Sequence, residues 1–198
     1  MFFLKVIGIG GYSCTGKSTL ARFISSYSDK SEIISLDFIL NDIKRKIAKP
    51  EDLEYGFHGD GDLIRLKNNP FNNISNERIN NIYLFARNLF VSGIINYKLF
   101  KLYHNNYELV VIEGVLLEAF YVGYDYLVKM ESSDDFRIIR RLNRDGFLVC
   151  RSVMNEWDEN DRLISLCRHY DYNVVINNNI SLDDLNGVSY NIFSKVMK

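Results

Sequence analysis

The chain has 198 residues, and its 24 Lys and Arg against 25 Asp and Glu give a formal net charge of -1 at pH 7. A chain this close to neutral has no overall attraction to nucleic acid or to anionic membranes, so any attraction for phosphate must be local. Apolar residues make up 47% and charged residues 25%, which is typical of one globular domain of this length. We therefore expect no nucleic-acid partner and no membrane partner.

The cysteines and the apolar start of the chain both indicate a cytoplasmic protein. Cys14, Cys150 and Cys167 are odd in number and lie at no metal-ligand spacing, which favours reduced thiols. The opening "MFFLKVIGIGG" is interrupted by Lys5 and leads into a glycine-rich loop instead of a cleavage-type segment. No other apolar run approaches the length that spans a membrane.

Short apolar runs alternate with longer amphipathic stretches along the chain. Five runs are predicted as strands: Phe3–Ile9, Glu32–Leu36, Glu108–Glu113, Tyr124–Met130 and Asn173–Ile176. Six stretches are predicted as helices: Lys17–Tyr27, Phe38–Ala48, Asn76–Tyr103, Asp134–Asp145, Val149–Cys167 and Leu182–Val196. The nearly continuous apolar runs are typical of parallel strands covered on both faces. The alternation predicts a single α/β domain, with a three-layer, doubly wound parallel sheet of five strands.

One connection is unusually long, because about seventy residues separate Leu36 from Glu108. We expect residues 38–107 to form a helical insertion that covers a substrate pocket. The alternative is a crossover that only packs on the sheet. The segment from Asn76 onward reads as one long helix or as two helices joined near Gly93.

The glycine-rich stretch "GIGGYSCTGKSTL", residues 8–20, ends the first predicted strand and opens the first predicted helix. It contains the pattern G-x-x-x-x-G-K-[ST], in which glycines permit a tight turn whose backbone N–H groups converge on phosphate oxygens. The lysine of this pattern brings positive charge to the β- and γ-phosphates, and the start of the helix favours the same anion. The alternative is a glycine-rich turn without a ligand, but the strand before and the helix after favour a nucleotide site. The predicted nucleotide-binding residues are Gly11, Ser13, Cys14, Thr15, Gly16, Lys17, Ser18 and Thr19.

A metal site is predicted from two oxygen-bearing residues. The Ser18 hydroxyl is the magnesium ligand of the glycine-rich pattern. The strand "ELVVIEG", residues 108–114, ends in Glu113, which could approach the metal directly or orient a water on it. The alternative is that Glu113 is an ordinary solvated acid at a strand end.

Asp37 follows the second predicted strand, in "IISLD". The carboxyl ends of strands line the ligand crevice of an open parallel sheet, so Asp37 is expected near the terminal phosphate. A carboxylate there can accept the proton of a hydroxyl group as its oxygen attacks phosphorus. The alternative is that Asp37 caps the helix predicted to begin at Phe38.

Four arginines in "DDFRIIRRLNRDGF" recur at i, i+3, i+4 and i+7 and so share one helical face: Arg137, Arg140, Arg141 and Arg144. Guanidinium groups suit phosphate oxygens and stabilise charge on a transferring phosphoryl group. The alternative is a solvated basic face paired with Asp134, Asp135 and Asp145.

This combination of motifs resembles the P-loop kinases of small metabolites, especially dephospho-CoA kinase and the uridine kinase type. The motifs that carry the resemblance are the glycine-rich loop, Asp37, "EGVLLE" at 113–118, "RRLNRDG" at 140–146 and "VVINNNISLDDL" at 174–185. They span most of the chain apart from about 45–107. The resemblance implies a nucleoside- and nucleotide-kinase-like P-loop fold, with Asp37 as the base and Arg140 and Arg144 in a lid region at about 137–160. It also implies that Asn177 and Asn178 lie near the adenine.

Two departures from the dephospho-CoA kinase pattern concern the acceptor. Gly114-Val115 stands where that family usually has a proline-containing step, and "EGVLL" is closer to the uridine kinase type. The H-P motif of the helical insertion is missing, because neither His58 nor His104 is followed by proline.

We therefore predict a kinase that uses ATP and Mg²⁺ to phosphorylate a hydroxyl group of a small metabolite, with dephospho-CoA favoured and a nucleoside close behind. Its predicted catalytic residues are Lys17, Asp37, Arg140 and Arg144. The rival hypotheses are a nucleotide-dependent switch or chaperone-like NTPase without a small-molecule acceptor, and a degenerate relative that binds nucleotide without turnover. No N-K-x-D guanine-reading motif occurs, which argues against a GTPase.

Overall fold

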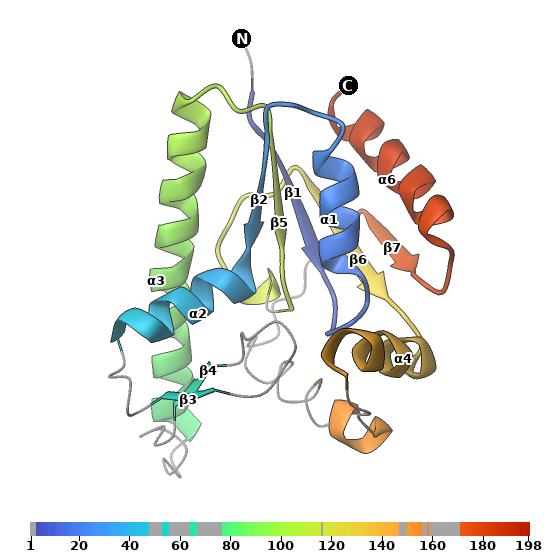
Figure 1. Ribbon diagram of the computed structural model, residues 1–198. Helices are drawn as coiled ribbons and strands as arrows, with labels where there is room; N and C mark the ends of the chain where they lie inside the picture. The colour runs from blue at the N-terminus through green and yellow to red at the C-terminus, as the bar shows by residue number, and fades with distance from the viewer. Residues whose placement is uncertain are drawn as a thin grey trace.

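The fold is built on a sheet of five parallel strands in the order β2–β5–β1–β6–β7 (Figure 1). A computed structural model of the chain describes residues 3–47, 53–55, 64–66, 77–115, 117–146, 150–155, 158 and 171–198. The strands of the sheet are β1 (Lys5–Gly10), β2 (Ser31–Ser35), β5 (Leu109–Glu113), β6 (Tyr126–Glu131) and β7 (Val174–Asn177). All five strands predicted from the sequence are confirmed, with ends shifted by at most two residues.

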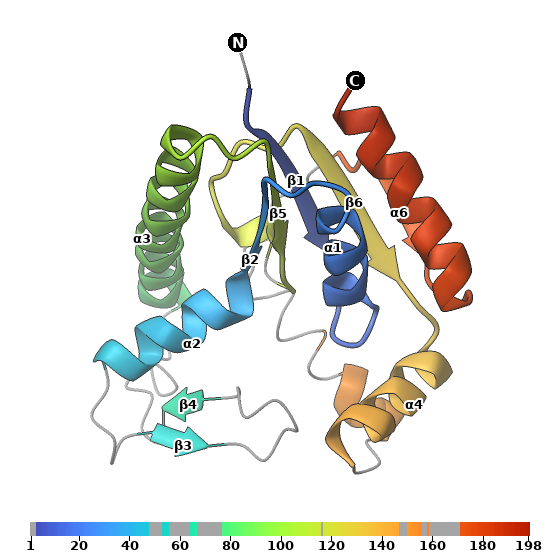
Figure 2. The ribbon, with the colours of Figure 1, turned by 45° about the horizontal axis from the view of Figure 1, so that its top comes forward.

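Helices cover both faces of the sheet, as the alternating pattern predicts. One face packs against α1 (Lys17–Ser25) and α6 (Leu182–Val196), and the other packs against α2 (Leu36–Ile47) and α3 (Glu77–His104) (Figures 1 and 2). A further helix, α4 (Asp134–Asp145), lies beyond the end of the sheet toward which the strand arrows point. The fold is therefore the three-layer, doubly wound α/β fold that the sequence predicts.

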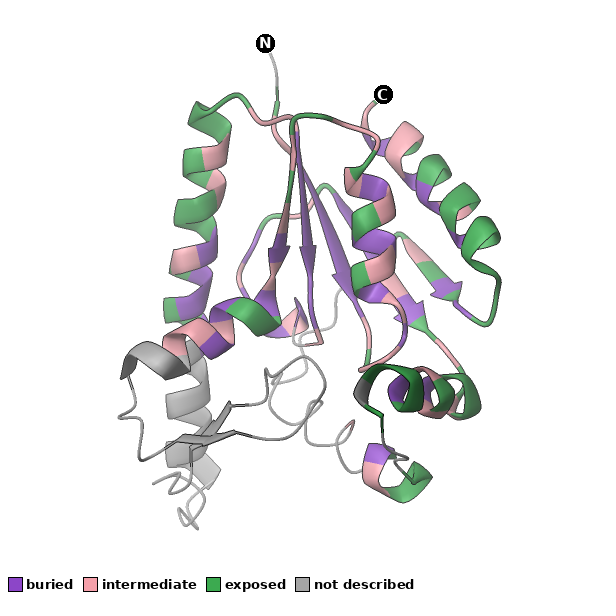
Figure 3. Cartoon of the chain, in the orientation of Figure 1, coloured by how far each residue is buried: buried purple, intermediate pink, exposed green. Residues whose placement is uncertain are grey.

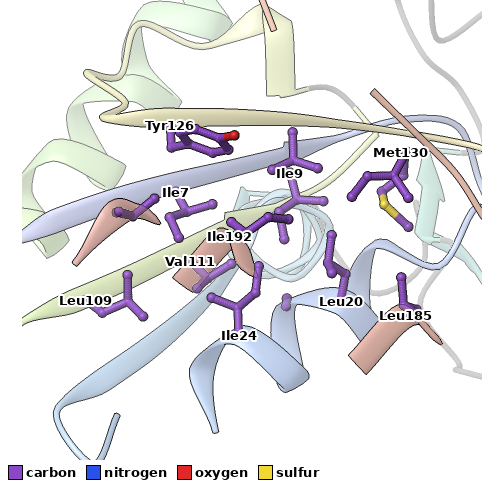
Figure 4. Packing of buried hydrophobic residues seen from close by; sticks show 14 residues of the cluster. Ile7, Ile9, Leu20, Ile24, Leu109, Val111, Tyr126, Met130, Leu185 and Ile192 are labelled. Atoms are coloured by element: carbon purple, nitrogen blue, oxygen red, sulfur yellow. The ribbon is translucent and has the colours of Figure 1, made fainter. Parts of the chain in front are cut away.

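The two cores arise from the alternation of side chains along buried strands. In β1, Ile7 and Ile9 pack toward α1 and α6, whereas Val6 packs toward α2 and α3. Figure 4 shows the first of these cores, where Leu20 and Ile24 of α1 meet the β1 side chains. The strands β1, β5 and β6 are buried along most of their length because both of their faces are covered, whereas the edge strands β2 and β7 are only partly buried (Figure 3).

The long connection between β2 and β5 contains α2, α3 and a small antiparallel hairpin. The helix α3 runs without interruption through Gly93, so one helix and not two occupies this segment. Its side chains Val91 and Ile95 are buried in the core with Ile112 of β5. This part of residues 38–107 is thus a crossover packed on the sheet, and the pocket-covering role of the remainder stays a prediction.

Two short elements of the structure were not predicted from the sequence. The hairpin pairs β3 (Leu53–Tyr55) with β4 (Ile64–Leu66), and strands of three residues are too short to show a reliable alternation. The 3-10 turn η2 (Leu117–Ala119) follows β5. Of the helix predicted at Val149–Cys167, residues 151–155 are helical, and most of the remainder lies outside the described residues.

Two further expectations concern the thiols and the membrane. Cys14 and Cys150 are free thiols, and Cys167 lies outside the described residues. Among the helices of the described part of the chain, none has the length and apolar character needed to cross a membrane.

The core between the sheet and the helices α1 and α6 stabilises the fold, so Ile24→Ala should lower the free energy of unfolding by about 2–5 kcal/mol. Ile24 of α1 is fully buried, so the substitution leaves a cavity between α1, the sheet and α6. Ile139→Ala is the matched control, since Ile139 is 55% exposed on α4, and it should change stability by less than about 0.5 kcal/mol. Urea unfolding measures both, and equal effects would contradict the described core.

Candidate functional site

A cavity of about 610 Å³ lies where the strands of the sheet end and the helices α1 and α2 begin. Most residues predicted for the site line it, together with side chains of α6 and the segment before it. The lining comprises Ser13, Cys14, Gly16, Lys17, Ser18, Thr19, Arg22, Asp37, Glu113, Val115, Arg140, Arg144, Asn178, Ile180, Leu182 and Leu185. In such sheets the carboxyl ends of the strands are where ligands bind.

The stretch from Gly11 to Ser18, which we refer to as the phosphate loop, has the backbone that its glycines predict. Gly11 and Gly16 have φ angles of 136° and 99°, a region that side chains with a Cβ rarely adopt. A Cβ at Gly11 would lie 2.2 Å from the backbone oxygen of Met130, so close packing requires glycine there as well. Cys14 has a φ of 62°, which indicates that the surrounding contacts impose the shape of the loop.

Those contacts are hydrogen bonds to successive backbone carbonyl groups of the loop. The Arg137 Nε donates to the Ser13 carbonyl oxygen at 2.9 Å. The Arg140 guanidinium donates to the Cys14 carbonyl at 3.4 Å, and the Asn178 Nδ2 donates to the Thr15 carbonyl at 2.8 Å. Each of the three carbonyls therefore has a donor from outside the loop.

This arrangement of carbonyl groups determines where the loop amides point. The C=O and the following N–H of a trans peptide point in opposite directions, and no cis peptide occurs in the described residues. The amides of Cys14 and Gly16 are therefore directed away from the donors that hold the preceding carbonyls. The N-terminus of α1 has no side-chain cap and no acidic residue in its first turn, so it favours an anion at the same place.

Lys17 lies across the phosphate loop. Its side chain is buried, and its Nζ donates to the Tyr12 carbonyl oxygen at 2.8 Å. A lysine held at this point brings its charge to the cavity wall. Arg22, Arg140 and Arg144 line the same cavity, so its cationic residues outnumber its two acids, Asp37 and Glu113.

Ser18 and Glu113, which the sequence predicts as metal ligands, contact each other in the structure. The Ser18 hydroxyl donates to the Glu113 Oε2 at 3.1 Å. Glu113 is only 4% exposed, so its interpretation as a solvated strand-end acid is wrong. A hydroxyl and a carboxylate suit Mg²⁺, which takes few protein ligands and fills its shell with water and phosphate oxygens. Among the described residues no group of three or more His, Cys, Asp or Glu could hold a metal ion.

Asp37 lies in the first turn of α2 and lines the cavity with Ser18 and Glu113. The helix begins at Leu36, one residue before Asp37, so Asp37 is not the residue that precedes the helix. An acid in the first turn still stabilises a helix through its dipole. Asp37 can therefore contribute to the helix and also face the ligand.

The four arginines do not act as one surface, which corrects their prediction as a group directed at phosphate. Arg140 and Arg144 line the cavity, as predicted, and burial lowers the pKa of the Arg140 guanidinium. Arg137 and Arg141 are each 3% exposed and bind the phosphate loop through Ser13. Neither of these buried residues is solvated, although Arg137 also forms, at 3.5 Å, one of the ion pairs with helix acids that the alternative expected.

Two residues important to this arrangement were not given these roles from the sequence. Asp158 accepts two hydrogen bonds from Arg137, at 2.6 and 2.7 Å, although it lies 21 residues away. Asn178 is buried, ties Thr15 through its side chain and accepts a 2.6 Å hydrogen bond from Arg140 at its carbonyl. Asn177, its neighbour at the end of β7, is exposed and does not line the cavity, so its contact with adenine stays a prediction.

Comparison with known proteins identifies structural neighbours. No family model matches the chain, and no curated protein matches it. TT1252 from Thermus thermophilus has a TM-score of 0.59 at 21% identity, with 98% of each chain covered. A sugar kinase from Janibacter sp. HTCC2649 has a TM-score of 0.52 at 11% identity, covering 98% of this chain and 96% of that one. A gluconokinase from Sinorhizobium meliloti 1021 has a TM-score of 0.51 at 14% identity, covering 100% and 95%. At these identities the likeness shows a shared fold along nearly the whole chain.

The ion pair of Arg137 and Asp158 is largely buried, so removing one partner should destabilise the protein by leaving the other charge buried without it. Arg137→Met leaves the Asp158 carboxylate buried without its guanidinium partner, and it should cost about 3–5 kcal/mol in urea unfolding. The double variant Arg137→Met with Asp158→Asn should cost less than the sum of the two single changes. Arg151→Met removes an exposed pair with Asp134 and Asp135 and serves as the control, costing at most about 1 kcal/mol. An additive double variant would contradict the pairing.

Proposed function

We propose that the protein is a kinase that transfers the γ-phosphoryl group of ATP to a hydroxyl group of a small metabolite. The observation that carries the proposal is one cavity that contains Lys17, the Ser18–Glu113 pair, Asp37 and two arginines of α4. The fold supports it, because two of the structural neighbours are named as kinases of small molecules.

Each residue has a role that follows from its place. The loop amides and Lys17 would bind the β- and γ-phosphates of ATP, and Arg140 and Arg144 would stabilise charge on the transferring group. Ser18 and Glu113 would hold Mg²⁺, which neutralises phosphate charge when bound. Asp37 would accept the hydroxyl proton as the acceptor oxygen bonds to the γ-phosphorus, the bond to the bridging oxygen breaks and ADP leaves.

For the acceptor, the motifs favour dephospho-CoA, and a nucleoside is the second candidate. The first rests on the "RRLNRDG" and "VVINNNISLDDL" segments, and the second on "EGVLL". The rival function is an NTPase without a small-molecule acceptor. An acid placed to take a proton is not needed for such a switch, and Asp37 in the cavity therefore argues for transfer to an acceptor.

An acceptor screen tests the function directly. ADP release from ATP and Mg²⁺ should depend on dephospho-CoA, uridine or cytidine, with the phosphorylated product identified by mass. Gluconate, shikimate and a no-acceptor reaction complete the panel. Lys17→Ala should lower turnover at least about 100-fold, since a cation directed at the donor phosphates is lost. The matched control Lys30→Ala removes a surface lysine paired with Glu108 and should leave turnover unchanged. ADP release that ignores every acceptor would favour the NTPase.

Asp37→Asn separates chemistry from binding. The amide cannot take the proton, so kcat should fall about 100-fold or more while the dissociation constant of ATP changes little. Asp29→Asn, at an exposed position before β2, is the matched control and should have no effect. Unchanged kcat in a folded Asp37→Asn protein would contradict the role as base, and a large loss of stability would favour a purely helix-stabilising role.

A further inference from the structure

The helix α3 exposes large apolar side chains on the face that points away from the sheet. Its inner side chains Val91 and Ile95 are buried, whereas Phe90, Tyr97 and Phe100 are 60%, 58% and 59% exposed. The helix lies at one edge of the molecule, and the outer face of its described part is coloured as exposed (Figure 3). A helix that is apolar on both sides is typical of one that is covered on both sides.

The outer face has the spacing of a helix-pairing seam. Phe90, Gly93, Tyr97, Phe100 and His104 follow one another at intervals of three, four, three and four residues. Such an alternation places residues on one stripe, the a and d positions of a heptad, which pack as knobs into the holes of a facing helix. The rings of Phe100 and His104 already meet edge to face along the stripe, with centroids 4.3 Å apart.

We propose that this stripe is the interface of a homodimer, in which α3 pairs antiparallel with α3 of a second copy of the chain. A two-fold axis between the helices would make the interface isologous, with each contact occurring twice. When two such helices pair antiparallel, each a residue of one copy lies opposite a d residue of the other copy. Phe90 then faces Phe100 of the second copy, and Gly93 faces Tyr97 of the second copy.

The shape of the stripe suits this register. A Cβ added at Gly93 would meet nothing within 4 Å, so Gly93 leaves an open gap between Phe90 and Tyr97. The large ring of Tyr97 from the second copy would fill this gap, and the two phenylalanines would stack beside it. Tyr97 thus meets a small residue of the second copy, and Phe90 meets another aromatic ring.

The charges on the helix also favour the antiparallel register. Residues 88–104 contain Lys98 and Lys101 and no acidic residue. A parallel pair would place each lysine beside its own copy. The antiparallel register separates the two Lys101 residues by twelve helical positions and the two Lys98 residues by six, roughly 18 Å and 9 Å at 1.5 Å per residue. Both distances exceed the screening length of about 8 Å at physiological ionic strength, the second only slightly, so the repulsion is weaker than between lysines placed side by side.

The area available is close to what a specific dimer requires. An aromatic side chain that is about half exposed offers roughly 100 Å² to a partner. Leu89 and Tyr103, at 45% and 46% exposure, flank the stripe formed by the three aromatic residues. Together these side chains could bury on the order of 1,000 Å² over both copies, near the lower limit for a specific interface.

Sedimentation equilibrium of the full chain tests the dimer at concentrations up to about 100 µM, since an interface near the lower size limit is expected to be weak. The wild type should dimerise, and Tyr97→Glu should raise the dimer dissociation constant at least about 30-fold, the effect of losing a central interface residue. Phe100→Glu provides a second variant with the same expected result. Tyr190→Glu is the matched control, because Tyr190 is 56% exposed on α6, and it should dimerise like the wild type. All variants should retain ATP binding, since no residue of 88–104 lines the cavity.

A monomeric wild type over this range would overturn the proposal. A dimer that survives Tyr97→Glu and Phe100→Glu, or one that Tyr190→Glu dissociates, would place the interface on another surface and overturn it equally.

A charge pair tests the antiparallel register. Phe90→Glu and Phe100→Lys should each weaken the dimer, whereas the double variant should dimerise at least about tenfold more tightly than either single variant. The reason is that the two introduced charges, negative at position 90 and positive at position 100, then face each other across the interface. In a parallel pair the double variant would place like charges together and weaken the dimer further. Failure of the double variant to exceed both single variants would overturn the register.

Discussion

Three successive backbone carbonyls of the phosphate loop have hydrogen-bond donors in distant parts of the chain, and the remaining site depends on this constraint. A loop outside any helix or sheet has no regular partners for its carbonyls, and burying them without partners would cost about 1–3 kcal/mol each. The donors to Ser13, Cys14 and Thr15 lie 124, 126 and 163 residues away. The glycines permit the turn, but α4 and the segment after β7 select its conformation and so direct the loop amides.

The acids of the site are brought together by strand order, which the loop motif itself does not specify. The strand β5 lies between β1 and β2, and Glu113 is in register with Ile9 of β1 and Ser35 of β2. The phosphate loop follows β1 and Asp37 follows β2, so the parallel arrangement places both beside Glu113. The hydrogen bond from Ser18 to Glu113 follows from this strand order. Ser18 belongs to the phosphate loop that follows β1, and Glu113 ends the neighbouring strand β5.

Most of the fold and the phosphate-loop part of the site could be predicted from the sequence, because the residues that define them lie close together in the chain. Buried parallel strands appear as continuous apolar runs, and the glycines, lysine and serine of the loop lie within eight residues of one another. The arginine spacing correctly indicated a shared helical face but could not indicate what that face meets. The Asp158 partner of Arg137 depends on tertiary packing. Which of Asn177 and Asn178 faces the phosphate loop depends on where β7 ends, because a shift of one residue there reverses the side to which a side chain points.

The contacts of α4 also limit how the cavity can close. The resemblance to small-metabolite kinases implies that Arg140 belongs to a lid, but Arg137 and Arg140 donate to carbonyls of the phosphate loop, and Arg141 donates to the Ser13 hydroxyl. Moving α4 as a unit would break these charge-assisted bonds together, at a cost of more than about 4 kcal/mol, and would release the loop. We therefore expect α4 to remain a fixed wall of the cavity. In the proposed kinase Arg140 would then be in place before the nucleotide binds, and a donor already in position stabilises developing charge without further reorganisation.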